Sequence, residues 1–149
     1  MYVYDNAGLT GALPAAWSQM PSVEYMDLQK NGLTGTLPAA WADLSTLEVL
    51  YLNDNQLTGT LPAAWSKLSR LTELDLSGNR FCGCEPDSWK TVSVLHDAVK
   101  DTPVAWANCS TANVCSASET LRNEVARDPL HWTVAALVAV VAVTCLIAA

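Results

Sequence analysis

Hydrophobic residues recur along the first part of the chain with a period of 24, which predicts a repeated structural element. Within one unit, Leu50 and Leu52 are two positions apart, so both point to one side of an extended strand while Tyr51 points to the other. The equivalent inward positions of the neighbouring units are Met26 and Leu28, and Leu74 and Leu76. Self-similarity at a period in the twenties predicts a solenoid, in which each unit buries its apolar face by stacking on its neighbours.

A second recurring stretch, Leu-Thr-Gly-Thr-Leu-Pro-Ala-Ala-Trp, occupies residues 33–41 and 57–65, and residues 9–17 differ from it only at Ala12. Proline is tolerated at the first position of a helix and alanine favours helix, so the end of this stretch predicts a short helical turn on the convex side. The tryptophans are then expected to stack along the solenoid as part of the core: Trp17, Trp41, Trp65 and Trp89. An aromatic platform for carbohydrate or peptide is the alternative.

Polar residues and glycines follow the same period. Asn31, Asn55 and Asn79 each follow a predicted strand, where a side-chain amide can satisfy backbone groups of adjoining turns. The glycines of the Leu-Thr-Gly stretches are expected to serve a backbone conformation closed to other residues, or a close approach between coils. The combined pattern is that of a leucine-rich repeat. We therefore predict an α/β-type solenoid with short parallel strands on the concave face and about four units, which cover residues 1–19, 20–43, 44–67 and 68–89.

Cysteines mark the end of the repeats. Cys82 and Cys84 enter the fourth unit and Cys109 and Cys115 follow, so residues 90–115 are predicted to form a disulfide-bonded C-terminal cap. Two disulfides indicate an oxidising compartment. The sequence does not choose between the three possible pairings, of which we favour Cys82–Cys109 with Cys84–Cys115. The cysteine spacings are not the usual short ligand pairs of a zinc site, so no metal is predicted.

An uncharged tail ends the chain after a polar spacer. Residues 116–131 form the spacer, and residues 132–149 are predicted to form a C-terminal hydrophobic helix. Small residues, a polar spacer and a terminal apolar run together match the attachment signal of a glycosylphosphatidylinositol (GPI) anchor. Ser116 is the favoured attachment residue, with Ser118 or Asn113 as alternatives. A retained single-pass transmembrane helix is the other interpretation of the tail.

Two further patterns concern processing. Asn108 matches the N-glycosylation signal, but the next residue, Cys109, is expected in a disulfide, which works against modification. Met1 to Asp5 lack the basic and apolar regions of a secretory signal, so we expect either a lost start or a truncated copy.

Charge and motifs limit the classes of function. The formal net charge is −7, from 15 acidic and 8 basic residues, which argues against nucleic acid and favours a protein partner with a basic surface. The two histidines, His96 and His131, are accompanied by no nucleophile elbow, phosphate loop or metal-ligand pair. We therefore predict no enzymatic activity, no cofactor and no small-molecule substrate.

Binding is expected at the outward-pointing strand positions, because solenoid proteins bind partners on their concave face. Acidic residues dominate these positions, and two tyrosines can serve as apolar anchors. The candidate partner-binding residues are Glu24, Tyr25, Asp27, Glu48, Tyr51, Asp54, Glu73 and Asp75. The alternative for each position is an ordinary solvated strand residue.

The repeated stretches at residues 33–41 and 57–65, together with Phe-Cys-Gly-Cys-Glu-Pro-Asp-Ser-Trp at residues 81–89, resemble the leucine-rich-repeat parasite surface antigen family of Leishmania and related kinetoplastids. The resemblance extends from Met1 to about Cys115. It implies a lipid-anchored protein on the cell surface that binds host receptors or serum proteins. The secretory signal, further N-terminal repeats and Thr/Ser/Pro-rich stalk of that family are absent from this sequence. A truncated, non-functional copy, or a single-pass membrane protein with a structural role, is the alternative.

Overall fold

A computed structural model of the chain describes residues 9–100, 102, 104 and 115. The chain divides into two units, Met1–Cys115 and Ser116–Ala149, and the described residues all belong to the first. The predictions for the apolar tail, for Asn108 and for the attachment residues Asn113, Ser116 and Ser118 lie outside the described residues.

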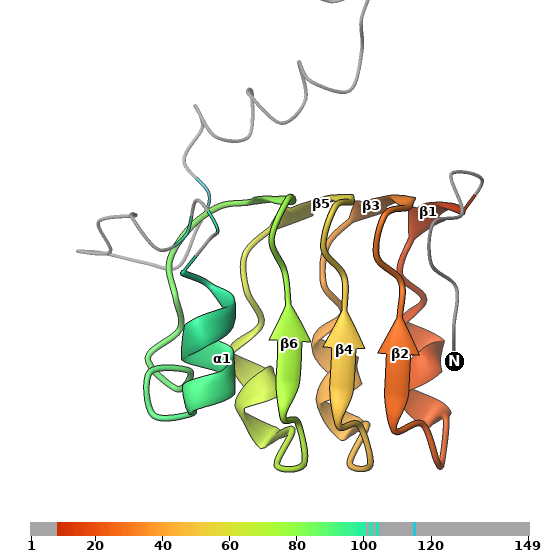
Figure 1. The fold of residues 1–149 in the computed structure, drawn as a ribbon, viewed down its shortest axis with the longest axis vertical. Coiled ribbons are helices and arrows are strands. Elements are labelled where there is room, and N and C mark those ends of the chain that lie inside the picture. Colours follow the sequence, from red (N-terminus) through yellow and green to blue (C-terminus); the bar gives the residue numbers. More distant parts are fainter. Residues whose placement is uncertain (1–8, 101, 103, 105–114, 116–149) are drawn as a thin grey trace, which may run out of the picture. The chain divides into compact units, whose positions relative to one another are not determined.

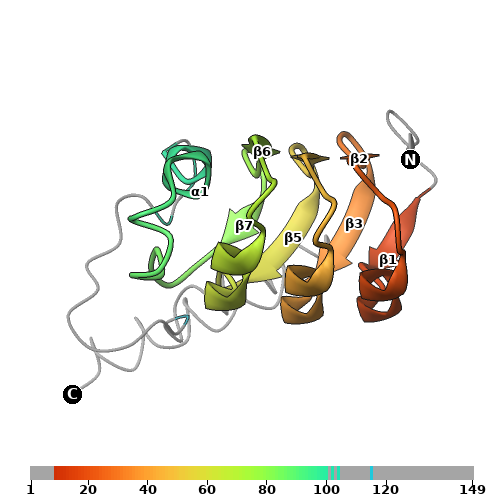
Figure 2. The same cartoon turned by 90° about the horizontal axis from the view of Figure 1, so that it is seen from below.

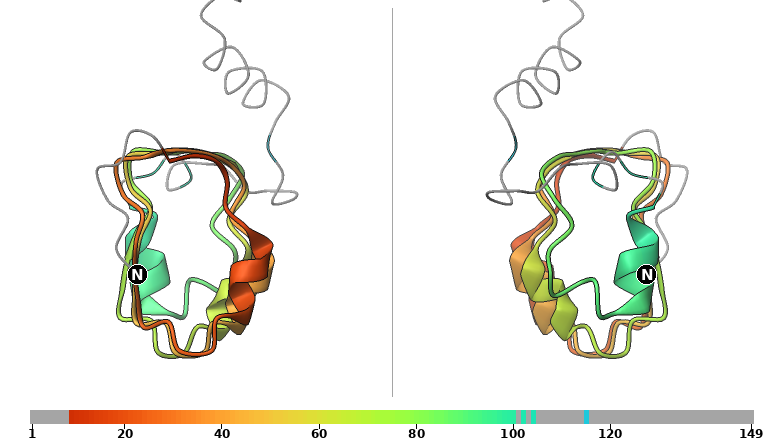
Figure 3. Two further views of the ribbon diagram at one scale, coloured as in Figure 1. Left: turned by 90° about the vertical axis from the view of Figure 1, so that its right-hand side faces the viewer. Right: turned by 90° about the vertical axis from the view of Figure 1, so that its left-hand side faces the viewer.

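The described coils contain two parallel sheets (Figures 1 and 2). One sheet has three strands: β2 (Tyr25–Asp27), β4 (Val49–Tyr51) and β6 (Glu73–Asp75). The other has four strands: β1 (Thr10–Ala12), β3 (Gly32–Gly35), β5 (Gln56–Gly59) and β7 (Arg80–Phe81). Strands of the two sheets alternate along the chain from coil to coil, and the coils superpose when viewed along the axis (Figure 3).

The three-stranded sheet confirms the predicted short parallel strands, whereas the four-stranded sheet was not predicted. Its strands come from the Leu-Thr-Gly stretches, in which Leu33 and Leu57 point into the core. The glycines that follow have positive φ, 81° at Gly35 and 84° at Gly59, as the sequence suggested. Each stretch therefore serves both as a strand and as the turn that leads to the helical side.

The Pro-Ala-Ala-Trp segments form short 3-10 helices, as predicted for a helical turn. They are η1 (Ala15–Gln19), η2 (Ala39–Asp43) and η3 (Ala63–Lys67). In each, the Trp backbone N–H donates to the proline carbonyl three residues earlier at 3.1 Å. Proline cannot donate a backbone hydrogen bond and has a fixed φ, so it starts these turns at little cost.

The tryptophans form the predicted column. Successive rings stack with centroids 5.9, 6.3 and 6.2 Å apart, from Trp17 to Trp89. From the second tryptophan on, the indole Nε1 also donates to a proline carbonyl of the preceding coil: Trp41 to Pro14, Trp65 to Pro38 and Trp89 to Pro62, at 3.0 to 3.1 Å. Trp41, Trp65 and Trp89 are fully buried. The column is therefore core rather than a surface platform, because stacking and the polar N–H are both satisfied inside the solenoid.

The asparagines form the second predicted column. Asn55 Nδ2 donates to the carbonyls of Leu28 and Leu52 at 2.9 and 3.0 Å, and its Oδ1 accepts the Leu33 N–H at 3.1 Å. Asn79 repeats this arrangement one coil later, with its Oδ1 accepting the Leu57 N–H at 3.0 Å. Each amide thus joins its own turn to the coil before it, which buried backbone groups require.

One disulfide is present among the described residues, between Cys82 and Cys115, with Cα atoms 5.1 Å apart. The predicted pairs Cys82–Cys109 and Cys84–Cys115 are therefore wrong. The chain leaves β7 at Cys82, passes through the cap and returns to the same place, so the last cysteine of the cap meets the first. Cys84 is also disulfide-bonded, and its partner is not among the described residues.

The first helix of the cap is α1 (Ser93–Ala98). Leu95 of this helix is buried, and so is Val99, which directly follows the helix. The helix contacts β6 and lies where another strand of the three-stranded sheet would stand (Figure 1). Among the described residues, no helix has the length and apolar character needed to cross a membrane.

We predict that Asn55→Ala lowers the free energy of unfolding by about 3 kcal/mol, because it leaves the buried Leu33 N–H without its acceptor and removes the hydrogen bonds that the amide donates to the Leu28 and Leu52 carbonyls. Urea denaturation with intact disulfides measures the change. The control is Asn53→Ala, which removes a partly exposed amide on the same coil and is expected to change stability by less than about 0.5 kcal/mol. Equal losses in the two variants would contradict a structural role for the column.

Candidate functional site

The outward face of the three-stranded sheet carries the candidate residues in register. Parallel pairing places Tyr25, Val49 and Glu73 in one row across the strands. The same pairing places Asp27, Tyr51 and Asp75 in the next row, with the buried Met26, Leu50 and Leu74 between them. The sheet therefore brings the predicted site residues of β2, β4 and β6 together on one surface.

Two tyrosines form the centre of this face. The rings of Tyr25 and Tyr51 meet edge to face, with centroids 5.9 Å apart and planes at 90°. The Tyr51 hydroxyl donates a hydrogen bond to Glu73 on the adjacent strand. This bond, together with the nearby negative charge, raises the pKa of Tyr51 to about 12. Tyr51 is therefore held in place by one aromatic and one polar neighbour.

Asp27 differs from the other acidic candidates because it is 5% exposed. Its carboxylate accepts hydrogen bonds from the Gln29 backbone N–H at 3.3 Å and from Gln29 Nε2 at 3.1 Å. The carboxylate thus closes a local turn after the strand, and its burial prevents it from meeting a partner's charge directly. Asp27 therefore lies in the predicted outward row of the sheet, but its side chain is not exposed.

The other acidic candidates are accessible, but their surroundings differ. Asp75 is half-buried, and its Oδ1 accepts bonds from the Ser77 backbone N–H at 2.9 Å and from Ser77 Oγ at 2.7 Å. Glu48 forms an ion pair with Arg70, a residue that the sequence analysis did not consider. Asp54 is exposed in a left-handed turn with φ of 55° and accepts a bond from Asn53. Glu24 is exposed at the start of β2.

A groove of about 510 Å³ lies at one end of this face, between β6 and α1. Its lining residues are Tyr51, Thr72, Glu73, Leu74, Asp75, Ser77, Ser93, Val94, Asp97 and Ala98. The sequence identified the three candidates Tyr51, Glu73 and Asp75, but not the wall from α1. A second hollow of about 500 Å³ lies before β2 and is lined by Met20, Pro21, Ser22, Val23, Glu24 and Tyr25.

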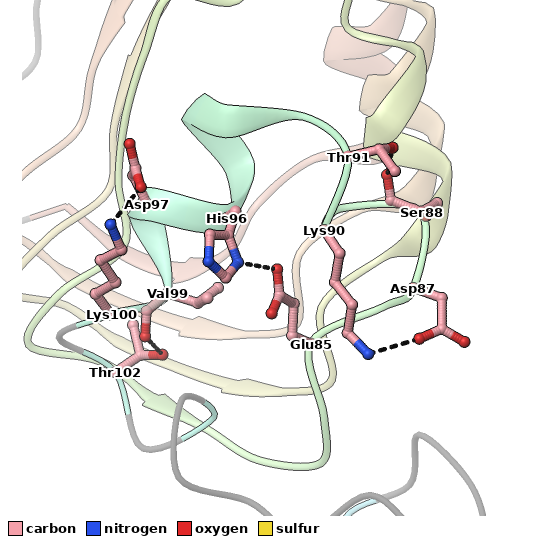
Figure 4. A network of polar contacts seen from close by, with 10 residues as sticks. All are labelled: Glu85, Asp87, Ser88, Lys90, Thr91, His96, Asp97, Val99, Lys100 and Thr102. Atoms are coloured by element: carbon pink, nitrogen blue, oxygen red, sulfur yellow. Dashed lines mark hydrogen bonds and ion pairs between the residues drawn. The ribbon is translucent and has the colours of Figure 1, made fainter.

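Ion pairs hold the outer side of the cap (Figure 4). Lys100 Nζ lies 2.6 Å from Asp97 Oδ1, and this pairing lowers the pKa of Asp97. Lys90 pairs with Asp87 at 2.8 Å and lowers the pKa of Asp87 in the same way. Glu85 stands where the earlier repeats have a buried leucine, and its carboxylate lies 2.8 Å from His96 Nδ1.

His96 and Glu85 therefore make a local polar contact within the cap. Within the described part of the chain, no group of three His, Cys, Asp or Glu side chains could hold a metal ion.

Comparisons with known proteins identify the repeats. Residues 21–81 match the sequence profile of the family described as "Leucine rich repeat". A comparison with curated protein sequences gives no match. Three similar solved structures come from plants. They are the ectodomain of the membrane receptor kinase GASSHO1/SCHENGEN3 from Arabidopsis thaliana in complex with CASPARIAN STRIP INTEGRITY FACTOR 2, a plant ice-binding protein, and the Arabidopsis receptor kinase HAESA in complex with the peptide hormone IDA and the co-receptor SERK1.

Their identities to this chain are 33%, 30% and 27%, with TM-scores of 0.52, 0.52 and 0.50. They cover 53%, 54% and 53% of this chain, which in turn spans 10%, 26% and 13% of their lengths. The likeness therefore concerns the repeats, and the chain corresponds to a small part of each of these proteins.

We predict that Tyr51 titrates near pH 12 and that Glu73→Ala returns its pKa toward the ordinary value of 10. Because the folded pKa lies above the unfolded one, the hydrogen bond contributes its full stability below pH 10, and this contribution is lost as the pH rises through 12. Nuclear magnetic resonance of tyrosine labelled at Cζ, with Tyr51→Phe for assignment, measures the shift. Glu24→Ala is the control and should leave Tyr51 unchanged.

Proposed function

We propose that the leucine-rich repeats of this chain form a protein-recognition module that binds a partner with a basic surface across β2, β4 and β6. The observation that carries the proposal is the continuous outward face on which the Tyr25–Tyr51 pair adjoins the accessible carboxylates of Glu73 and Asp75. Rigid aromatic anchors beside charged groups are the composition that protein interfaces favour. Two of the similar structures are of plant receptor kinases in complex with named partners, among them a peptide hormone and a co-receptor, which supports a protein or peptide partner.

The proposal changes the set of contact residues that the sequence suggested. Asp27 is left out of the contact surface, because its carboxylate is buried and hydrogen-bonded. Glu48 is partly neutralised by Arg70, so it contributes less to the attraction. The strongest acidic contacts are therefore expected toward β6, on Glu73 and Asp75.

We also propose that the module acts on the outside of a cell. The disulfide between Cys82 and Cys115 supports an oxidising environment. Small residues around Ser116, a polar spacer and an uncharged tail support attachment through a GPI anchor, with a retained transmembrane helix as the alternative. The resemblance to kinetoplastid surface antigens suggests host receptors or serum proteins as partners.

We predict that the double charge reversal Glu73→Lys with Asp75→Lys abolishes binding of the purified chain to host cells or serum proteins, because it reverses the field of the face. Flow cytometry of the labelled chain on cells, and its capture on immobilised serum proteins, measure binding. The matched control Asp43→Lys changes an exposed acidic residue on η2 and should leave binding unchanged. Undiminished binding of the double variant, with an unchanged thermal melt, would reject this face as the interface.

Release by phospholipase tests the anchor. If the tail is a GPI signal, phosphatidylinositol-specific phospholipase C should release the protein from intact cells into the medium. A retained transmembrane helix predicts that the protein stays with the cells. Ser116→Leu places a large side chain at the favoured attachment residue and should reduce the amount of protein that the phospholipase releases from the cell surface. Ser110→Leu is the control and should leave this amount unchanged.

A further inference from the structure

The groove between β6 and α1 is asymmetric in its chemistry. Leu74, Val94 and Ala98 supply apolar surface, whereas Glu73, Asp75 and Asp97 supply carboxylates. Serine hydroxyls of Ser77 and Ser93 complete the lining. An aliphatic stem that ends in a polar charged group matches such a lining, because its stem can cover apolar atoms while the head stays among acceptors.

The negative charge in this groove is not neutralised equally. Asp97 is paired with Lys100, as Glu48 is with Arg70 and Asp87 with Lys90 elsewhere on the surface. Among the described residues, no lysine or arginine forms an ion pair with Glu73 or Asp75. Tyr51 and Ser77 hold these two carboxylates through neutral donors, which fix their positions without cancelling their charge.

We propose that this groove receives one lysine or arginine side chain from an extended segment of the protein partner. The inference rests on the proposed function. It specifies the chemical group that the β6 end of the binding face recognises. The head group of that side chain lies between Glu73 and Asp75, and its methylene stem lies along Leu74 and the α1 residues Val94 and Ala98. A metal ion is a poorer occupant, because no group of three ligating side chains is present among the described residues.

The position of the aromatic pair sets a spacing for the bound segment. Adjacent strands lie about 4.8 Å apart, so the middle of the Tyr25–Tyr51 pair is about one and a half strands, or about 7 Å, from Glu73 along the sheet. In an extended chain, side chains on the same side recur every second residue, at about 7 Å. The recognised pattern is therefore an apolar residue over the tyrosines and a lysine or arginine two positions away.

Selection from a displayed library of random linear heptapeptides tests this pattern on the full chain with its disulfides formed. The expected product on the wild type is an apolar residue separated by one position from arginine or lysine. Binding of a synthetic peptide with that pattern is then measured by fluorescence anisotropy. Replacing its arginine by citrulline, which keeps the shape and removes the charge, should weaken binding about tenfold, and so should Glu73→Gln with Asp75→Asn.

The control Asp43→Asn with Asp87→Asn removes two charges outside the groove and outside the candidate contact residues, and should retain the wild-type affinity. Moving the arginine to the adjacent position, which turns it to the other side of the segment, should weaken binding as citrulline does. Selected peptides without a basic residue, or equal binding of the citrulline peptide, would overturn the groove proposal. If these peptides still bind the wild type and lose binding to Tyr51→Ala, the proposal that this face recognises proteins is retained. If the library yields no enriched sequence, both proposals are rejected.

Discussion

Hydrogen bonding between successive coils is the constraint on which the rest of this structure depends. A single coil cannot satisfy its own backbone, because its strands are two to four residues long and pair only with the coils on either side. Asn55 and Trp65 show how side chains complete this pairing, since each donates to a carbonyl 27 residues earlier in the chain. The residue type in these columns is fixed by the contacts between coils, so residue types differ between units mainly on the outward face.

This division explains which parts of the structure could be predicted from sequence. Buried residues such as Leu50, Asn55 and Trp65 have equivalents 24 residues away in the neighbouring units, and their roles follow from stacking similar units. The second sheet was missed because Thr34 and Gly35 suggest a turn by composition, and only contacts with the adjacent coils turn this segment into a strand. Pairing between coils is not visible in a local pattern.

The sequence predicted which residues lie in the outward rows of the candidate site, but not which of them are exposed. The spacing that places Tyr51 outward also places Asp27 outward, yet Asp27 is buried because Gln29 folds back to donate to it. Asp75 holds the equivalent position and bonds to Ser77, whose short side chain leaves the carboxylate more accessible. Whether an acidic residue is free to meet a partner thus depends on the residue two positions later. The prediction of the cysteine pairing was wrong because sequence spacing does not show which cysteines meet in space, and in the structure Cys115 meets Cys82.

The end of the repeats is where a distinct site can arise. Within the repeats, each coil meets another coil of the same shape, which fills the space beside every strand. At β6 the neighbour is α1, and a helix cannot continue the strand pairing or match the spacing of a sheet, so a groove opens between the two elements. The groove combines residues fixed by the period, such as Glu73, with cap residues such as Val94 that the period does not determine. Specificity is therefore expected where the symmetry of the solenoid ends, while the repeated columns keep that end rigid.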